Sequence, residues 1–152
     1  MQTTSPGPST GMKLRAADAA DLSVFATFLQ DAVVPVADMT YLSGDERFAL
    51  VANRFRWEQA GEPVEGRIFE RVHAGVCFDK VTAVRQRGLD RSKIGQILSL
   101  LTIEPGDGHI DLLFSAGVSI RLEVSRILCH FQDLDEPWPT QWRPEHALLD
   151  EG

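Results

Sequence analysis

The sequence has 152 residues, a formal net charge of −7 at pH 7, 43% hydrophobic residues and 24% charged residues. This length suits one domain that buries its core without disulfide or metal staples, and no apolar run approaches the roughly 18 residues that cross a bilayer. The acidic balance weighs against general nucleic-acid binding, because phosphate neutralisation needs a basic surface. Composition therefore predicts a soluble, single-domain protein with no membrane segment.

The first eleven residues are rich in proline, serine, threonine and glycine, and they lack a basic region followed by an apolar core. This composition predicts a disordered leader over residues 1–11 rather than a secretion signal, so the cytoplasm is the expected compartment. A single α+β domain is expected over residues 12–134. It should begin with a short strand or extended arm at residues 12–15.

A helix is the next expected element. Asp18 is a plausible N-cap with Asp21 three residues later, which is an acidic form of the capping box. One face of this helix should be buried, because apolar residues recur at helical spacing. These residues are Leu22, Phe25, Ala26, Leu29 and Val33. Pro35 should end the helix or lie just beyond it.

From residue 36 to residue 133 the sequence predicts antiparallel strands with short turns. A strand at residues 36–42 and another at 48–57 form an expected hairpin, and strands follow at 68–78 and 81–87. Residues 94–103 are apolar on both faces, which leaves helix and strand open and favours strand in the second half. Pro105 to Gly108 give the strongest turn signal, and a further strand is expected at 109–114.

The pattern over residues 118–131 changes phase once. Apolar residues occupy even positions up to Val124 and odd positions from Ile127 onward. This predicts one bent strand with a bulge at Ser125 or Arg126 and with Val124 and Ile127 both facing inward. A similar slip follows Phe78, and the string Ala-Gly-Val occurs at residues 74–76 and 116–118. Internal duplication is one hypothesis for this, and chance recurrence of a short string is the other.

These elements predict an α+β fold that is mainly antiparallel β. Two three-stranded meanders would form a bent sheet pair or a partial barrel, with the N-terminal helix packed against it. This architecture describes shape and assigns no chemistry.

No catalytic, cofactor or metal signature emerges from the chain. There is no Gly-x-Ser-x-Gly elbow, and neighbouring Cys129 and His130 should face opposite sides of a strand. His73 and Cys77 share a face but stand roughly 13 Å apart at the usual strand rise, too far for one metal ion. We therefore predict no catalytic residue, no cofactor and no metal, with both cysteines as buried reduced thiols.

Two groups of arginines are the candidate binding residues. Asn53, Arg54 and Arg56 alternate with aromatic residues in one expected strand, and Arg85 with Arg87 lies in another. The simpler interpretation is a solvated face whose arginine stems pack over aromatic rings. If the two groups converge, they would bind an anion or a partner through bidentate contacts.

The last expected segment covers residues 135–152. It places Trp138 and Trp142 among three prolines, which rules out a helix or a central strand and predicts an extended tail packed on the domain. The alternative is an exposed apolar patch used for self-association or for a partner.

Several strings of the chain form a set of structural rather than catalytic motifs. They are Asn53, Arg54, Phe55, Arg56, Trp57 and Glu58, then Phe78, Asp79, Val81 and Val84, then Ile120, Arg121, Leu122, Glu123 and Val124, and finally Asp133 with Trp138. Together they resemble a family of small bacterial proteins known only as a domain of unknown function, over most of the chain from Lys13 onward. The resemblance implies a cytosolic, single-domain bacterial protein and supplies no substrate, cofactor or catalytic residue.

The leading functional hypothesis is a non-catalytic binding or assembly module that uses an open strand edge or the tryptophan tail. Its expected partner is another protein or a second copy of the chain. A small-molecule or anion-binding domain that uses the arginines is the first alternative. An enzyme of unknown class is the second, and the sequence favours a role without catalysis.

Overall fold

The computed structural model describes residues 12–55, 71–90, 92–93 and 95–134, and ten strands within these ranges form one antiparallel sheet. The strands are β1 (Lys13–Ala16), β2 (Val33–Pro35), β3 (Met39–Leu42), β4 (Arg47–Phe55), β5 (Arg71–Phe78), β6 (Val81–Arg87), β7 (Ile97–Gly106), β8 (His109–Phe114), β9 (Ser119–Val124) and β10 (Cys129–Asp133). The described residues also form one α-helix, α1 (Ala19–Leu29), and three short 3-10 turns, η2 (Val36–Asp38), η3 (Ser43–Asp45) and η5 (Ser115–Gly117). The predicted α+β class, mainly antiparallel β, is confirmed.

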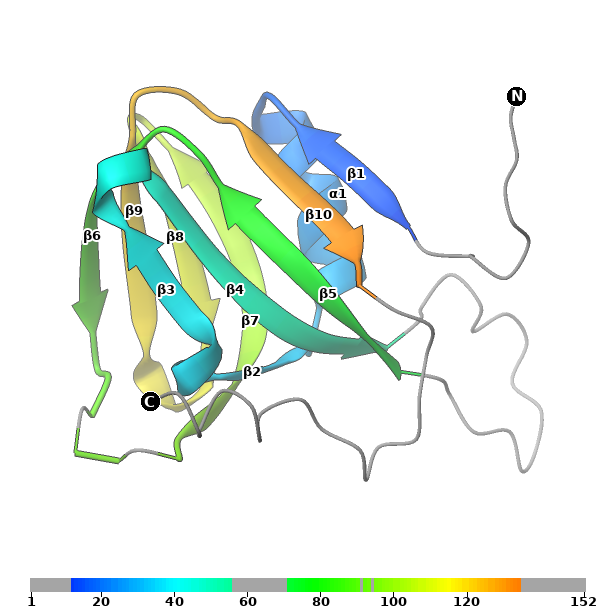
Figure 1. Ribbon diagram of the computed structural model, residues 1–152, viewed down its shortest axis with the longest axis vertical. Helices are drawn as coiled ribbons and strands as arrows, with labels where there is room; N and C mark the ends of the chain where they lie inside the picture. The colour runs from blue at the N-terminus through cyan, green and yellow to red at the C-terminus, as the bar shows by residue number, and fades with distance from the viewer. Residues whose placement is uncertain (1–11, 56–70, 91, 94, 135–152) are drawn as a thin grey trace.

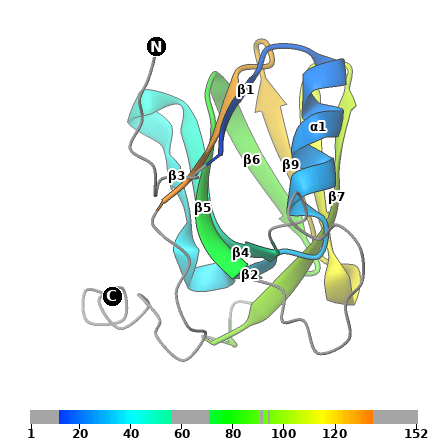
Figure 2. The ribbon, with the colours of Figure 1, turned by 90° about the vertical axis from the view of Figure 1, so that its right-hand side faces the viewer.

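The sheet is strongly bent and does not close. Its strand order is β1-β10-β5-β4-β2-β7-β8-β9-β6, and β3 pairs with β4 beside this path. Figure 1 shows the two resulting layers, with β3, β4, β5 and β10 in front of β6, β9, β8 and β7. Figure 2, turned by 90°, shows α1 standing between β1 on one side and β7 on the other. Alternate strand residues fill the space between the layers, among them Phe48, Leu50, Val76, Phe78, Leu112, Leu122 and Phe131.

The helix begins at its expected cap. The Asp18 carboxylate accepts a hydrogen bond from Asp21 N at 2.8 Å, and the Asp21 carboxylate accepts one from Ala17 N at 2.9 Å. These two bonds satisfy backbone donors that a helix start leaves unpaired. The residues that α1 buries are Leu22, Phe25 and Leu29.

The helix ends earlier than its apolar spacing predicts. The chain leaves the helical conformation after Leu29, and Asp31 adopts a left-handed φ of 63°. Val33, expected on the helix, instead lies in β2 opposite Asn53 and Ser99. The strand expected over residues 36–42 is likewise shorter, because η2 occupies its first half and β3 its second. Tertiary pairing with β4 and β7 thus overrides the local helical pattern.

The expected bent strand over residues 118–131 is wrong. The chain forms two strands there, β9 and β10, joined by a corner at residues 125–128. β9 pairs with β8 and β6, whereas β10 pairs with β1 and β5. A matching corner at Asp79 and Lys80 joins β5 to β6, and the two corners bond each other. Asp79 N donates to Leu128 O at 2.8 Å, and Ser125 N donates to Lys80 O at 3.0 Å.

The phase change after Ser125 therefore marks a turn between two parts of the sheet, with no bulge inside one strand. Val124 is buried and Ile127 is half-buried against the core, so both sides of the corner contribute to it.

The structure does not support the duplication hypothesis. Residues 74–76 lie inside β5, whereas Ala116 and Gly117 lie in η5 with φ values of 63° and 73°. The segments that follow the two strings, β6 and β9, are antiparallel partners, and Val81 pairs with Val124.

Candidate functional site

The outer face of β8, β9 and β6 carries the clearest gathering of functional side chains. Cross-strand pairing aligns Asp111, Arg121 and Arg85 in one row over the three strands. The neighbouring row holds Leu113, Ser119 and Arg87. On β8 and β9 these residues alternate with buried ones, so the polar set shares the face that points away from the core. Pairing of β6 with the distant strand β9, which also pairs with its sequence neighbour β8, therefore creates the cluster.

Two ion pairs order part of this face. Arg121 binds Asp111 with two hydrogen bonds, Nε to Oδ1 at 2.8 Å and Nη2 to Oδ2 at 3.0 Å. Arg85 Nε donates to Glu123 Oε2 at 2.5 Å. The hydrogen bonds from Arg121 lower the pKa of the Asp111 carboxyl, and the bond from Arg85 lowers the pKa of Glu123. Both carboxylates are therefore ionised at neutral pH.

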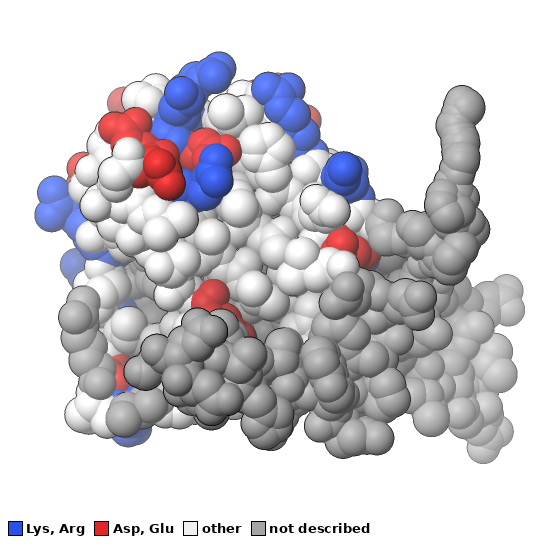
Figure 3. Space-filling model, viewed as in Figure 1, with Lys and Arg blue, Asp and Glu red and all other residues white. Residues whose placement is uncertain are grey.

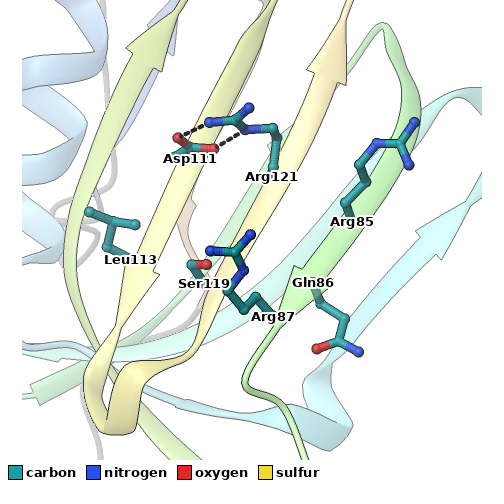
Figure 4. Close-up of a pocket in the computed structure, with 7 residues that line it drawn as sticks. All are labelled: Arg85, Gln86, Arg87, Asp111, Leu113, Ser119 and Arg121. Atoms are coloured by element: carbon teal, nitrogen blue, oxygen red, sulfur yellow. Dashed lines mark hydrogen bonds and ion pairs between the residues drawn. The ribbon is translucent and has the colours of Figure 1, made fainter.

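Around these residues the surface forms a polar hollow of about 280 Å³. Its lining residues are Arg85, Gln86, Arg87, Asp111, Leu113, Ser119 and Arg121. Figure 4 shows Arg121 turned toward Asp111 and Arg87 reaching from the end of β6 toward Ser119 on β9. Within the part of the chain that the structure describes, Arg87 makes no ion pair. An incoming anion could therefore bind the Arg87 guanidinium without displacing a carboxylate of the described residues.

Arg54 does not belong to this surface. Its side chain is fully buried, and it donates to Asp133 through Nε at 2.9 Å and Nη2 at 2.8 Å. The guanidinium also lies 5.3 Å from the centre of the Phe131 ring and donates to Phe55 O at 3.0 Å. Arg54 therefore does not line the hollow, because its side chain lies in the core and joins β4 to β10, and its expected binding role stays a prediction.

The remaining predicted binding residues outside β6 are Asn53, Arg56, Trp138 and Trp142. Asn53 accepts hydrogen bonds from Arg71 on the neighbouring strand β5, at its side-chain and its backbone oxygen. The Arg71 guanidinium also lies 4.0 Å from the centre of the Phe55 ring. Arg56, Trp138 and Trp142 lie outside the described residues. Of the predicted binding residues that the structure describes, Arg85 and Arg87 line the hollow, whereas Asn53 and Arg54 do not.

A second charged cluster lies at the corner where β5 turns into β6. Asp79 accepts from Arg47 Nε at 2.7 Å and lies 3.3 Å from His130 Nδ1. Figure 3 shows acidic and basic side chains interleaved over that end of the molecule. Cys77 stands opposite His130 across β5 and β10. No local sequence pattern indicates this cluster, because Arg47 lies in β4, Asp79 in the corner between β5 and β6, and His130 in β10.

The two thiols occupy different environments. Cys129 is fully buried as expected, whereas Cys77 lies half-buried on the outer face, contrary to the expectation of burial. Burial raises the pKa of the Cys77 thiol and raises that of Cys129 to about 12. The raised pKa gives neither thiol the properties of an activated nucleophile.

Native-state thiol titration should therefore separate the two cysteines. At pH 8 only on the order of 10⁻⁴ of a thiol with so high a pKa is ionised, so Cys129 should react with a disulfide reagent only after unfolding, whereas Cys77 reacts slowly in the native protein. The Cys77→Ser variant should show no native reaction, and Cys129→Ser should react like the parent. Equal native rates for both thiols would contradict the buried position of Cys129.

Two features that would indicate other kinds of site are absent from the described ranges. No group of three or more histidine, cysteine, aspartate or glutamate side chains there is placed to hold a metal ion. No helix among the described residues combines the length and the apolar character that a membrane crossing requires.

Comparison with known proteins gives one match. Residues 12–146 match the model of a family described as a protein of unknown function, DUF2948. The chain belongs to the DUF2948 family. No curated protein and no solved structure was found to match it. The predicted resemblance to a domain of unknown function is confirmed.

The match to DUF2948 spans all ten strands and the helix, and therefore every residue of the hollow. The family description names no substrate, partner or reaction. The geometry of the hollow is accordingly the basis for the function proposed for this DUF2948 chain.

Proposed function

We propose that this chain is a non-catalytic binding module that takes an anionic group of its partner in the hollow over β6, β9 and β8. The observation that carries the proposal is Arg87, a guanidinium in the hollow that has no ion-pair partner among the described residues. In this proposal, β3 to β5 form one three-stranded meander, β7 to β9 form a second, and the helix packs against both. The hollow lies on the outer face of β8 and β9 in the second meander and of the neighbouring strand β6.

The charges of the hollow suit an anion. Arg85, Arg87 and Arg121 supply three positive charges, and the neighbouring carboxylates of Asp111 and Glu123 balance only two. The side chains of Arg85 and Arg121 are 69% and 50% exposed, so water screens their ion pairs and exchanging one carboxylate for another costs little. A guanidinium offers two parallel donors, which fits a carboxylate or a phosphate.

The environment of this hollow also bears on the other hypotheses. Its lining holds guanidinium, carboxylate and hydroxyl groups, and among the described residues no hydrogen bond joins the Ser119 hydroxyl to the Asp111 carboxylate, which favours binding over catalysis. A homo-oligomer stays a separate candidate, supported by the exposed apolar residues Ile97 and Leu101 on β7. Its test is the mass in solution, measured by light scattering.

Isothermal titration with three probes tests the proposal. Inorganic phosphate, succinate and a hexaglutamate peptide should bind at low ionic strength, in rising order of affinity as the number of anionic groups grows. Arg87→Gln should lower the affinity for the peptide about tenfold, since a charge-assisted hydrogen bond is lost. Arg15→Gln, an exposed change on β1 at the opposite end of the sheet order, is the matched control and should leave affinity unchanged.

Two outcomes would overturn this function. One is that none of the three anions binds at millimolar concentration. The other is that Arg15→Gln weakens the peptide as much as Arg87→Gln does, which would show a diffuse response to charge without a site.

A further inference from the structure

The strand that carries Arg87 is also a free edge of the sheet. β6 ends the strand order, and among the described residues it pairs only with β9. The strand ends at Arg87, because Gly88 turns the chain with φ of 86°, and a Cβ there would lie 2.5 Å from Gly117 O. One side of β6 thus offers backbone donors and acceptors to another strand.

The start of β6 is already tied to the other layer. Val81 N donates to Glu46 O at 2.9 Å, and Tyr41 on β3 donates its hydroxyl to Val81 O at 3.0 Å. Beyond Val81 no further contact of this kind fixes the edge within the described ranges. The available part of the edge is therefore residues 83–87.

Side chains along this part alternate between two chemistries. Arg85 and Arg87 are exposed on the outer face, two residues and therefore roughly 7 Å apart along the strand. Val84 and Gln86 face the other side, where Val84 packs against the core and Gln86 Oε1 accepts from Leu89 N at 3.2 Å. Figure 4 shows the side chains of Arg85, Gln86 and Arg87 leaving β6 in different directions.

We propose that the partner is an extended, acidic segment of another protein that adds to β6 as an additional strand. Alternate acidic side chains of that segment lie beside Arg85 and Arg87, and its intervening apolar side chains lie beside Val84. The backbone bonds supply affinity, and the arginines select acidic residues. This inference rests on the proposed function, because it assigns the partner class of the same site.

Charge and the strand edge together favour this occupant over two others. A second copy of the chain pairing through β6 would bring Arg85 and Arg87 close to the same residues of its twin, which like-charge repulsion disfavours. A nucleic acid would use the arginines but would leave the backbone groups of the edge without partners.

Fluorescence anisotropy with labelled peptides tests the proposal. The parent probe is a seven-residue peptide of alternating glutamate and valine, and two derivatives carry backbone N-methyl groups at alternate positions, one in each register. An added strand bonds its neighbour through every second amide, so one derivative should bind at least about tenfold more weakly and the other should bind like the parent. Arg87→Gln should lower the affinity for the parent peptide, and Arg15→Gln should leave it unchanged.

Amide hydrogen exchange gives a second measurement, because binding of an anion to the arginine side chains alone would not slow exchange of the β6 amides. Binding of the parent peptide should slow exchange within residues 83–87, because edge amides gain partners.

The outcomes separate the two proposals. If both N-methylated peptides bind like the parent and exchange in β6 is unchanged, strand addition is wrong and anion binding stands. If a single-stranded oligonucleotide binds more tightly than the parent peptide through Arg87, the partner class is wrong. If neither peptide nor small anion binds, the proposed function fails as well.

Discussion

Replacing Asp133 with alanine should lower the free energy of unfolding by about 3–5 kcal/mol, because the change leaves the buried Arg54 guanidinium without its carboxylate. The same carboxylate accepts a hydrogen bond from Met12 N at 2.9 Å, so the variant also loosens β1 at the edge of the sheet. Urea denaturation followed by circular dichroism gives the free energy, and the melting temperature should fall by about 10–20 °C.

Two further variants identify the cause of that loss. Gln132→Ala changes the exposed neighbour in the same strand and should alter stability by no more than about 0.5 kcal/mol. The double variant Arg54→Met with Asp133→Leu removes both charges at once and should be more stable than Asp133→Ala, because no uncompensated charge is left in the core. A double variant less stable than Asp133→Ala would show that the pair does more than neutralise its own charges.

Phe131→Ala should cost about 3–5 kcal/mol of unfolding free energy, since it empties the core where the helix meets the sheet. The Phe131 ring is fully buried, and it meets the Phe25 ring edge-on at 5.6 Å between centroids and 75° between planes. Its face also lies 5.3 Å from the Arg54 guanidinium, so the change removes an aromatic and a cationic contact together.

Chemical denaturation of matched variants measures this effect. Val24→Ala removes an apolar side chain that is 44% exposed on the same helix as Phe25, and it should cost no more than about 0.5 kcal/mol. A double-mutant cycle of Phe25→Ala and Phe131→Ala should give a coupling energy of about 0.5–1.5 kcal/mol. A loss below about 1 kcal/mol in Phe131→Ala would contradict the packing of α1 against β10.

Local chemistry in the sequence predicted much of the secondary structure. Asp18 caps the helix as expected, because a short carboxylate before an apolar run satisfies the first free amides. Alternation of apolar and polar residues predicted β5, β6 and β8 within a few residues. The same alternation located an irregularity at Ser125 or Arg126, but it predicted a bulge inside one strand where the structure has a corner between β9 and β10.

For the candidate site, the sequence selected Arg85 and Arg87 and missed Asp111, Ser119 and Arg121. No local pattern brings these residues together, because Arg121 meets Asp111 and Arg85 only through strand pairing. The opposite error concerns Arg54. Its place beside Phe55 suggested a wet, cationic face, but the register of β4 turns Arg54 into the core, where Asp133 of β10 neutralises it.

The sequence by itself thus determined where the helix begins and where several of the strands form, because periodicity and capping act between residues that are close in the chain. Only the tertiary structure decided which arginine is buried, which strand is a free edge and which side chains share the hollow. These features depend on pairing between distant segments, such as Val81 with Val124 and Arg85 with Arg121. The alternation pattern of a strand shows which of its residues share a face, but it does not show which other strand will pair with that strand.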